Sequence, residues 1–349
     1  MEPHSQFQVS GNAGWFSKRF GALKLILNDR GRTPGHKPLL AVFAALGSAW
    51  VFVLVTLGAF TTSINAGMAF PDWPLSNGSL NPSGWLSNVS MFAEHSHRLS
   101  ASTMGLITVF LGVWLWLREE RAWLRRMGAW AIGLVILQGV VGGLRVLLDP
   151  VQVPGFEMTL GQMLRIPHGV IAQVYVCLLI AIAAACSRAW IEKPVAVSGG
   201  MRRLGRICVI LLFIQLTIAA IMRHNNAGLA IPSFPWSTPD GGLLPAVWSF
   251  KVAIHFAHRV MACILAVGLV WLAAKTWLER GAPLFLRPAA SFLISLLALQ
   301  ILLGAAIIRT YRDPAITTAH VLVGALVLAT AFWLTWFAHR DWIETKWER

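Results

Sequence analysis

Eight apolar segments, each about as long as a lipid bilayer is thick, dominate this chain of 349 residues. A helix needs about 20 predominantly apolar residues to cross the hydrocarbon core. Hydrophobic residues make up 56% of the sequence and charged residues 13%, which excludes a water-soluble globular protein of this size. We therefore expect an all-α polytopic membrane protein with spans near residues 38–62, 94–117, 127–147, 163–186, 203–223, 251–275, 287–308 and 315–337.

The first four and the last four segments carry a repeated sequence. The stretch 65–74 (NAGMAFPDWP) returns 161 positions later as 226–235 (NAGLAIPSFP), and the same offset carries His97-Arg98 onto His258-Arg259. Repeated halves of membrane proteins usually meet around the functional site. We expect two pseudo-symmetric four-helix bundles, with a basic cytoplasmic tail (1–37), an N-terminal repeat (38–186), a cytoplasmic linker (187–202), a C-terminal repeat (203–337) and a second cytoplasmic tail (338–349).

The basic charge of the chain indicates its orientation. Most of the 29 Lys and Arg residues lie in the two tails and in the 118–126, 187–206 and 275–287 loops, so both termini are predicted to be cytoplasmic and the long 63–93 and 224–250 loops to face outward. The net charge of +14 therefore reports topology and does not predict a nucleic-acid partner. Residues 1–37 show neither a cleavable signal peptide nor a clear presequence, which favours a bacterial cytoplasmic membrane.

Four histidines lie within apolar segments, where ionisable groups are costly and are functional candidates by default. His97, His168, His258 and His320 fall in the outer halves of the second, fourth, sixth and eighth spans, two in each repeat. Paired imidazoles on facing helices are typical axial ligands of haem iron. Zinc is less favoured because it takes three or four close ligands, while a proton relay stays open. The four cysteines also lie in the spans and predict small buried side chains, with no disulfide framework.

Charged neighbours accompany these histidines. Arg98 and Arg259 each follow a candidate ligand and are expected to pair with haem propionates, or else to reach the outer headgroups. Glu94 lies three residues before His97, on the same helix face, and is a candidate proton shuttle unless it only begins the helix. The repeat offset replaces Glu94 with His255 in the second half.

These motifs together resemble the haem A synthase family. They comprise Glu94-x-x-His97-Arg98, the His258-Arg259 echo, single histidines at 168 and 320, and the repeated outer-loop sequence, and the resemblance covers essentially all eight spans. It implies oxidation of a methyl group of haem O, by successive hydroxylations, to the formyl group of haem A for terminal oxidases. It also implies haem b held by His258 and His320, with haem O bound as substrate between His97 and His168, and Glu94 as the catalytic carboxylate.

The resemblance also implies partners, and the sequence departs from it in two places. The chain would lie in the lipid bilayer, receive haem O from a haem O synthase, use an electron donor that the sequence does not identify, and supply terminal oxidase assembly, with a homo-oligomeric state left open. Some family members carry cysteine pairs in the outer loops, where this chain has Phe70 and Ser76, then Ile231 and Ser237. His255 is a second departure, and we expect it to be an alternative ligand or to bind a propionate.

Two other functions fit parts of the sequence. A non-catalytic dihaem b-type cytochrome would carry electrons across the membrane, but its ligands should lie near both leaflets. A repeat-built transporter would show broken helices near mid-membrane, and only Pro167, near an outer end, interrupts a span.

Overall fold

The structure, a computed structural model, describes residues 35–347, and no strand occurs among them. Eight of its helices are long and apolar enough to cross a membrane, as the sequence predicts. They are α2 (Pro38–Ser63), α3 (Val89–Arg118), α4 (Ala122–Leu147), α5 (Leu160–Cys186), α7 (Gly199–His224), α8 (Phe250–Leu278), α9 (Leu286–Arg309) and α10 (Pro314–Ala338). Two short helices, α6 (Arg188–Glu192) and α11 (Arg340–Trp347), follow α5 and α10.

Several of the spans begin at polar caps that the apolar pattern did not reveal. The Asn88 side chain accepts hydrogen bonds from the N–H groups of Ser90 and Met91, so α3 begins five residues before the predicted span. Thr159 and Gln162 form a reciprocal capping box at the start of α5. The earlier start of α3 places Glu94 in its second turn, which contradicts the alternative that this carboxylate only begins the helix.

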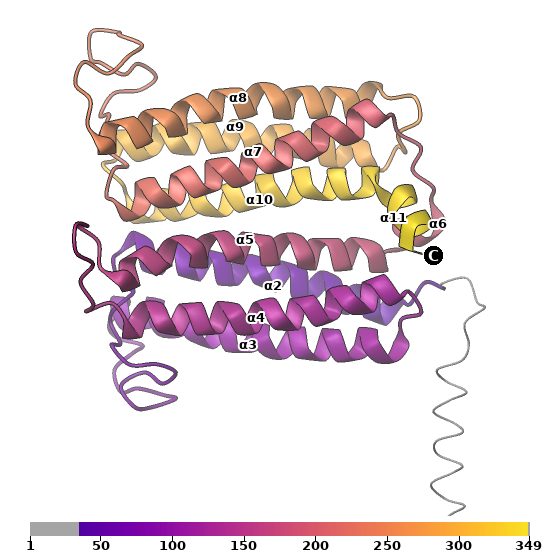
Figure 1. Cartoon of the computed structure of the whole chain (residues 1–349), viewed down its shortest axis with the longest axis horizontal. Helices are drawn as coiled ribbons and strands as arrows, with labels where there is room; N and C mark the ends of the chain where they lie inside the picture. The colour runs from indigo at the N-terminus through magenta and orange to yellow at the C-terminus, as the bar shows by residue number, and fades with distance from the viewer. Residues whose placement is uncertain (1–34, 348–349) are drawn as a thin grey trace, which may run out of the picture. The chain divides into compact units, whose positions relative to one another are not determined.

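The spans pack as two sets of four (Figure 1). In the first set, α2 and α4 each contact α3 and α5; in the second, α7 and α9 each contact α8 and α10. The sets meet through α2 against α10, α5 against α7 and α5 against α10, a surface called the seam below. The side chains of α5 and α10 are the most buried among the spans, because each of these helices contacts two helices of the other set.

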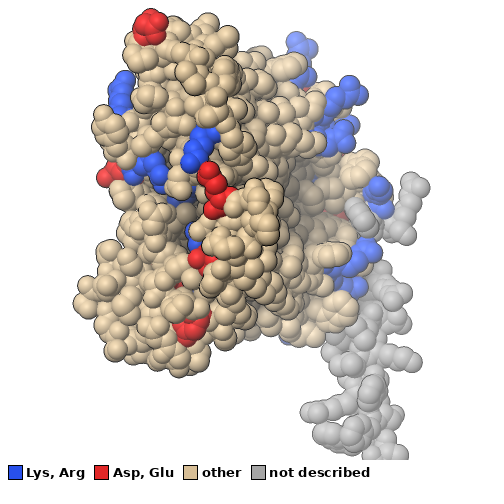
Figure 2. All heavy atoms as spheres, turned by 60° about the vertical axis from the view of Figure 1, so that its left-hand side comes forward, with Lys and Arg blue, Asp and Glu red and all other residues tan. Residues whose placement is uncertain are grey.

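The long loops gather at one end of the bundle and the short helices at the other (Figure 1). The 64–88 and 225–249 loops share backbone features at equivalent positions: left-handed asparagines and cis peptide bonds before proline. These are Asn65 (φ 56°) and Asn226 (φ 53°), and Trp73-Pro74 and Phe234-Pro235. Asparagine tolerates the left-handed region better than most residues. Figure 2 turns this end toward the reader and shows basic and acidic side chains near one another on it.

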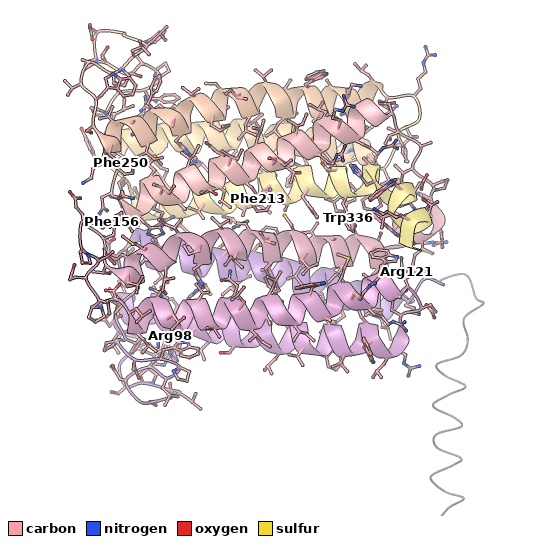
Figure 3. The ribbon with its side chains drawn as sticks, viewed as in Figure 1. Arg98, Arg121, Phe156, Phe213, Phe250 and Trp336 are labelled. Carbon is pink, nitrogen blue, oxygen red and sulfur yellow. The ribbon has the colours of Figure 1, made fainter. Side chains whose placement is uncertain are left out.

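An ionic and aromatic cluster closes the opposite end of the bundle. Arg121 lies there with Trp336, far from Arg98 at the loop end (Figure 3). The Arg121 guanidinium contacts Glu119 at 2.8 Å and Glu344 of α11 at 3.3 Å. Burial raises the pKa of the Glu119 carboxyl, but the hydrogen bonds and charge of Arg121 outweigh burial and leave that pKa below its ordinary value. The cluster therefore joins the C-terminal helix to the α3–α4 turn.

The cysteine prediction is confirmed in part. All four cysteines are free; Cys177, Cys186 and Cys208 are buried, whereas Cys263 is exposed on α8. The prediction failed at Cys263 because an apolar span also has a face that packs against no other helix of the chain.

Candidate functional site

The four predicted histidines occupy matching depths at the loop end of the bundle. His97, His168 and His258 are each the ninth residue of α3, α5 and α8, and His320 is the seventh residue of α10. At 1.5 Å per residue, the rings lie roughly 9–12 Å along their helices from the ends that carry the loops. His97 lies within electrostatic range of His168, and His258 within range of His320. The structure thus brings the histidines together in the predicted pairs.

Each of the four imidazoles has a buried nitrogen without a hydrogen-bond partner in the described part of the chain. The Nδ1 atoms of His97, His168, His258 and His320 are buried and have no hydrogen-bond partner among the described residues. Buried polar atoms are normally paired, because an unmatched group loses its hydration without compensation. Four such atoms in corresponding places indicate that a group from outside the chain contacts these rings.

Glycines leave room for three of the rings. A Cβ built on Gly58 of α2 would lie 2.8 Å from Cε1 of His97, and one on Gly142 of α4 would lie 3.1 Å from Cε1 of His168. Gly304 of α9 is related in the same way to His320, at 3.3 Å. From the sequence, Gly142 and Gly304 mark helix–helix contacts; in the structure they receive imidazoles. Gly58 had no sequence signal of its own.

Glutamines four residues before two of these glycines also contact the histidines. Gln138 donates to the backbone carbonyl of His168 at 3.0 Å, and the Gln300 amide lies 3.2 Å from Nε2 of His320. Each of these amides therefore joins two neighbouring helices. In addition, Gln215 of α7 donates to the carbonyl of His258 at 3.0 Å.

Arg98 holds the first long loop over the site. Its guanidinium donates to the backbone carbonyls of Phe70 (2.9 Å), Asp72 (2.8 Å) and Leu75 (2.5 Å). It also pairs with the carboxylate of Glu94 at 2.7 Å, and the other oxygen of Glu94 accepts the Phe70 N–H at 3.1 Å. Glu94 is fully buried, and the Arg98 guanidinium and the Phe70 N–H are its polar partners. Both Nη atoms of Arg98 thus already bind protein oxygens, and the pairing of Arg98 with a propionate stays a prediction.

The second half repeats this arrangement with one exchange. Arg259 donates to the carbonyls of Ile231 (3.0 Å), Ser233 (2.7 Å) and Trp236 (3.2 Å), which are the positions equivalent to those bound by Arg98. His255 replaces the carboxylate: its Nδ1 accepts the N–H of Ile231 at 3.2 Å, and its Nε2 lies 3.3 Å from Arg259 Nε. Here His255 connects the loop to Arg259. Its predicted role toward a cofactor stays a prediction.

Two further histidines have roles that the sequence did not reveal. His95 is buried; its Nδ1 lies 3.1 Å from the Ser76 hydroxyl, and its ring meets Trp85 edge-on. It anchors the first long loop. His224, in the last turn of α7, lies within electrostatic range of His168 in the other set of helices. Only the packing of α5 against α7 brings those two residues near one another.

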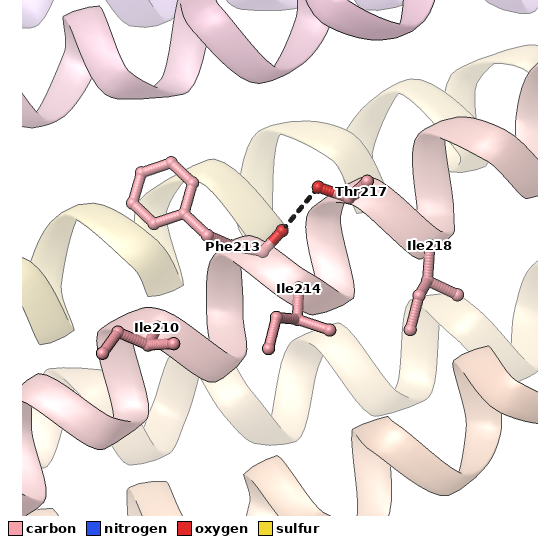
Figure 4. A pocket seen from close by; sticks show the side chains of 5 residues that line it. All are labelled: Ile210, Phe213, Ile214, Thr217 and Ile218. Carbon is pink, nitrogen blue, oxygen red and sulfur yellow. Dashed lines mark hydrogen bonds between the residues drawn. The ribbon is translucent and has the colours of Figure 1, made fainter.

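An apolar hollow on α7 has none of these histidines in its lining (Figure 4). Its volume is about 390 Å³, and it is lined by Ile210, Phe213, Ile214, Thr217 and Ile218. The Thr217 hydroxyl donates to the Phe213 carbonyl at 2.9 Å, so the hollow offers aliphatic and aromatic surface without a free polar group. It suits lipid or an apolar tail, and it contains no side chain suited to acid–base or redox chemistry.

The site defines a class of protein. Among residues 35–347, no group of three or more histidines, cysteines or carboxylates could hold a metal ion by itself. Pairs of part-buried imidazoles in a membrane-spanning helical bundle, each with a buried Nδ1 atom, suit a planar cofactor that takes a ligand on each of its two faces. The chain is a multi-pass membrane protein with two such pairs, one of which lies beside a buried carboxylate.

Comparison with known sequences identifies the family. Residues 41–332 match the model of the COX15-CtaA family of cytochrome oxidase assembly proteins, and the chain belongs to this family. It is similar to the heme A synthase of Shouchella clausii, with 25% identity over 79% of this chain and 89% of that protein. The heme A synthases of Erythrobacter litoralis (24% identity; 81% and 92% covered) and Rhodospirillum centenum (25%; 88% and 90%) are similar to a comparable extent.

Proposed function

We propose that this protein is a haem A synthase that oxidises a methyl group of haem O to a formyl group within the membrane. The observation that carries the proposal is the set of four buried imidazole nitrogens without partners, arranged as two pairs, with a buried carboxylate beside one pair. The family of the chain and the names of its relatives agree with this chemistry.

The residues present fit haem at both pairs. Imidazoles from facing helices supply nitrogen ligands, and glycines at 58, 142 and 304 leave space beside three of the rings. In the proposal, His258 and His320 hold a resident haem b, and His97 and His168 hold haem O as substrate. Bound haem supplies one-electron and oxygen chemistry that no amino acid side chain provides. The two sets of helices then form pseudo-symmetric halves, residues 38–186 for the substrate and 203–337 for haem b.

Glu94 is proposed to deliver or remove protons at the reacting side of the ring. Turning a methyl group into a formyl group by successive hydroxylations removes two hydrogens from the carbon and adds one oxygen, so protons must move between the site and its surroundings. Glu94 pairs with Arg98, and the Phe70 N–H fixes the direction of the carboxylate. His255 fills this position in the other half, which has no carboxylate there. We assign the chemistry to the first half on this difference.

Water exclusion is the proposed task of the long loops. Arg98 and Arg259 fix the loops by bonds to three backbone carbonyls each, and His95 adds a contact to the first loop. A closed site keeps reactive chemistry away from bulk solvent. Arg98 and Arg259 would thus help to keep water out of the cofactor sites, although their N–H groups bond to protein atoms.

We also propose where the protein lies in the cell and which proteins it exchanges haem with. The sparse Lys and Arg content of the long loops favours an outward-facing site in a bacterial cytoplasmic membrane, with the C-terminal helix and the N-terminal tail on the cytoplasmic side. A haem O synthase would supply the substrate, and terminal oxidase assembly would receive the product. All four histidines lie at one end of the bundle, which disfavours an electron-carrying dihaem cytochrome that joins the two membrane faces.

Replacement of Glu94 by glutamine tests the proposal. The variant is expressed with a haem O synthase in a host that lacks haem A, and the extracted haems are separated by chromatography. We expect formyl product to fall by roughly 10²–10⁴-fold, the usual contribution of a positioned acid or base, with haem b content unchanged. Glu157→Gln, which alters an exposed carboxylate in the 148–159 loop, is the control and should keep full yield. Full formyl yield from Glu94→Gln would remove this residue from the mechanism, and no haem A from the unaltered protein would refute the function.

A further inference from the structure

Arg145 lies beside the buried carboxylate of Glu94. It belongs to the last turn of α4, and its Nη1 donates to the carbonyl of Gly67 at 2.8 Å. Glu94 accepts the N–H of Phe70, three residues further along the same loop, at 3.1 Å. Glu94 also provides the largest favourable electrostatic interaction of Arg145. One short segment of the first long loop therefore holds the cation and the carboxylate near one another.

Asp149 continues this arrangement toward the solvent. It follows the C-terminal end of α4, one turn beyond Arg145, and lies within electrostatic range of that guanidinium. The Asp149 carboxylate pairs with Arg165 of α5 at 2.6 Å, and its side chain is 20% exposed, whereas that of Glu94 is 0% exposed. A Cβ built on Gly161 would lie 2.5 Å from the Asp149 backbone, so the first turn of α5 fixes this residue in place. Glu94, Arg145 and Asp149 therefore form a series that leads from the enclosed interior to the edge of the loop end.

The second half does not repeat these charges. Gly142 and Gly304 align α4 with α9, because each lies beside an imidazole, and His168 and His320 align α5 with α10. The corresponding positions of the second half have neither a carboxylate nor a guanidinium: Ile307 for Arg145, Tyr311 for Asp149, Thr317 for Arg165 and His255 for Glu94. A half that only holds a haem for electron transfer needs no exchange of protons, whereas oxidation of a methyl group does. The charged series is therefore present in the half to which we assign the chemistry.

We propose that Glu94, Arg145 and Asp149 form the route by which protons pass between the first pair of histidines and the solvent at the loop end, with Asp149 as its outer residue. The route rests on the proposed function and deepens it, because a carboxylate that is 0% exposed cannot exchange protons with solvent directly. Arg165 pairs with Asp149 but is not itself part of the route.

Each transfer on this route moves one proton, and one O–H bond breaks as another forms. The proton passes between a Glu94 oxygen and water, and between water and an Asp149 oxygen. Arg145 stays charged throughout, since a guanidinium does not lose its proton in proteins. A guanidinium has five N–H donors, and in the described part of the chain a protein oxygen accepts from Nη1 of Arg145 alone. Its task is therefore to hold the connecting water between the two carboxylates.

Replacement of Asp149 tests the route. Asp149→Asn removes the carboxylate and breaks the ion pair with Arg165. Arg165→Met is the matched control, because it breaks the same ion pair and keeps the carboxylate. The rate of haem A formation is measured in cells that express the full-length protein with a haem O synthase. Affinity for haem O is measured separately, from the Soret band of the purified protein.

We expect Asp149→Asn to form haem A at least about tenfold more slowly, a smaller loss than the 10²–10⁴-fold typical of a positioned acid or base, because water partly replaces an outer residue. Added formate, a small carboxylate that can reach the loop end, should restore part of the rate, and Asp149→Glu should keep most of it. Arg165→Met should stay within about twofold of the unaltered rate, since a partly exposed ion pair contributes little. All of these variants should keep the haem O affinity and the haem b content of the unaltered protein.

Four results would overturn the route: full rate in Asp149→Asn, an equal loss in Arg165→Met, no response to formate, or a loss of haem O affinity that matches the loss of rate. The last result would mean that Asp149 acts on the structure of the pocket. If the unaltered protein itself forms no haem A, the proposed function is refuted instead.

Discussion

Gly58→Ala gives the most direct test of how the protein seats an axial histidine. The new methyl carbon would lie 2.8 Å from Cε1 and 3.2 Å from Nδ1 of His97. Carbon atoms in contact prefer separations of about 3.5–4.0 Å, so the ring or the helix must move by about 0.7 Å. Overpacking of this kind costs about 1–3 kcal/mol when neighbours cannot yield.

The same substitution at Gly142 and Gly304 should give a series of decreasing effects on histidine ligation. At Gly142 the methyl would lie 3.1 Å from His168, and at Gly304 it would lie 3.3 Å from His320, which leaves shortfalls of about 0.4 Å and 0.2 Å. Misplacement of a functional group by about 1 Å can lower the rate of the reaction that it serves by about 10²-fold. We therefore expect loss of ligation to rank Gly58 first, Gly142 second and Gly304 last.

Gly139→Ala is the matched control for this series. Gly139 lies on α4, one turn before Gly142, and nothing lies within 4 Å of a Cβ built there. Alanine is a better helix former than glycine by about 1 kcal/mol, so this variant should be at least as stable as the unaltered protein. It separates the effect of the methyl group on the imidazole from the general effect of alanine in a span.

The assay measures haem per polypeptide and the low-spin spectrum of iron with two imidazole ligands, with thermal unfolding in detergent as a check on folding. Gly58→Ala should lose at least about tenfold in haem O affinity at the first site while haem b stays bound at the second. If Gly58→Ala keeps the affinity and spectrum of Gly139→Ala, the contact with His97 does not govern ligation and the reasoning is refuted.

Two further predictions concern the first long loop. Arg98→Met removes the donors to the carbonyls of Phe70, Asp72 and Leu75, so limited chymotrypsin digestion should cut the loop about tenfold faster or more, while Arg309→Met should leave the rate unchanged. The second prediction concerns pH: burial raises the pKa of the Asp72 carboxyl, but the N–H groups of Gly78 and Asn77 outweigh burial and leave that pKa below its ordinary value. The ionised Asp72 carboxylate therefore stabilises the folded loop above the ordinary pKa of about 3.9, and this stabilisation is lost as the pH falls through the lowered pKa. Hydrogen exchange at the two amides, corrected for intrinsic rate, should accelerate over that window, and Asp72→Asn should abolish the acceleration.

Much of the fold follows from local sequence, because span number and approximate limits depend only on the length and polarity of each segment. The apolar runs predicted all eight spans, and the errors lie at their ends, where caps such as Asn88 and Thr159 extend the helices. The histidine pairs were predictable for a similar reason: equal offsets along helices that start at the same membrane face give equal depth. These properties need no knowledge of which helices touch.

The contacts of the arginines were not predictable in this way. The position of Arg98 beside His97 suggested a propionate partner, yet its guanidinium binds carbonyls 23–28 residues earlier in the chain. The path of an irregular loop decides those partners, and hydropathy carries no information about it. Arg145, in the last turn of α4, likewise donates to the carbonyl of Gly67, 78 residues earlier in the chain.

The sequence by itself determined a duplicated chain of eight spans, with paired histidines at one membrane face and a carboxylate in only one half, because these are properties of order and spacing. Tertiary structure alone decided that Gly58 receives His97, that His255 takes the place of Glu94 in the loop contact, and that Arg223 reaches the other half. The physical reason is that such contacts depend on how helices pack across the seam, and side chains far apart in the sequence meet only after that packing is complete.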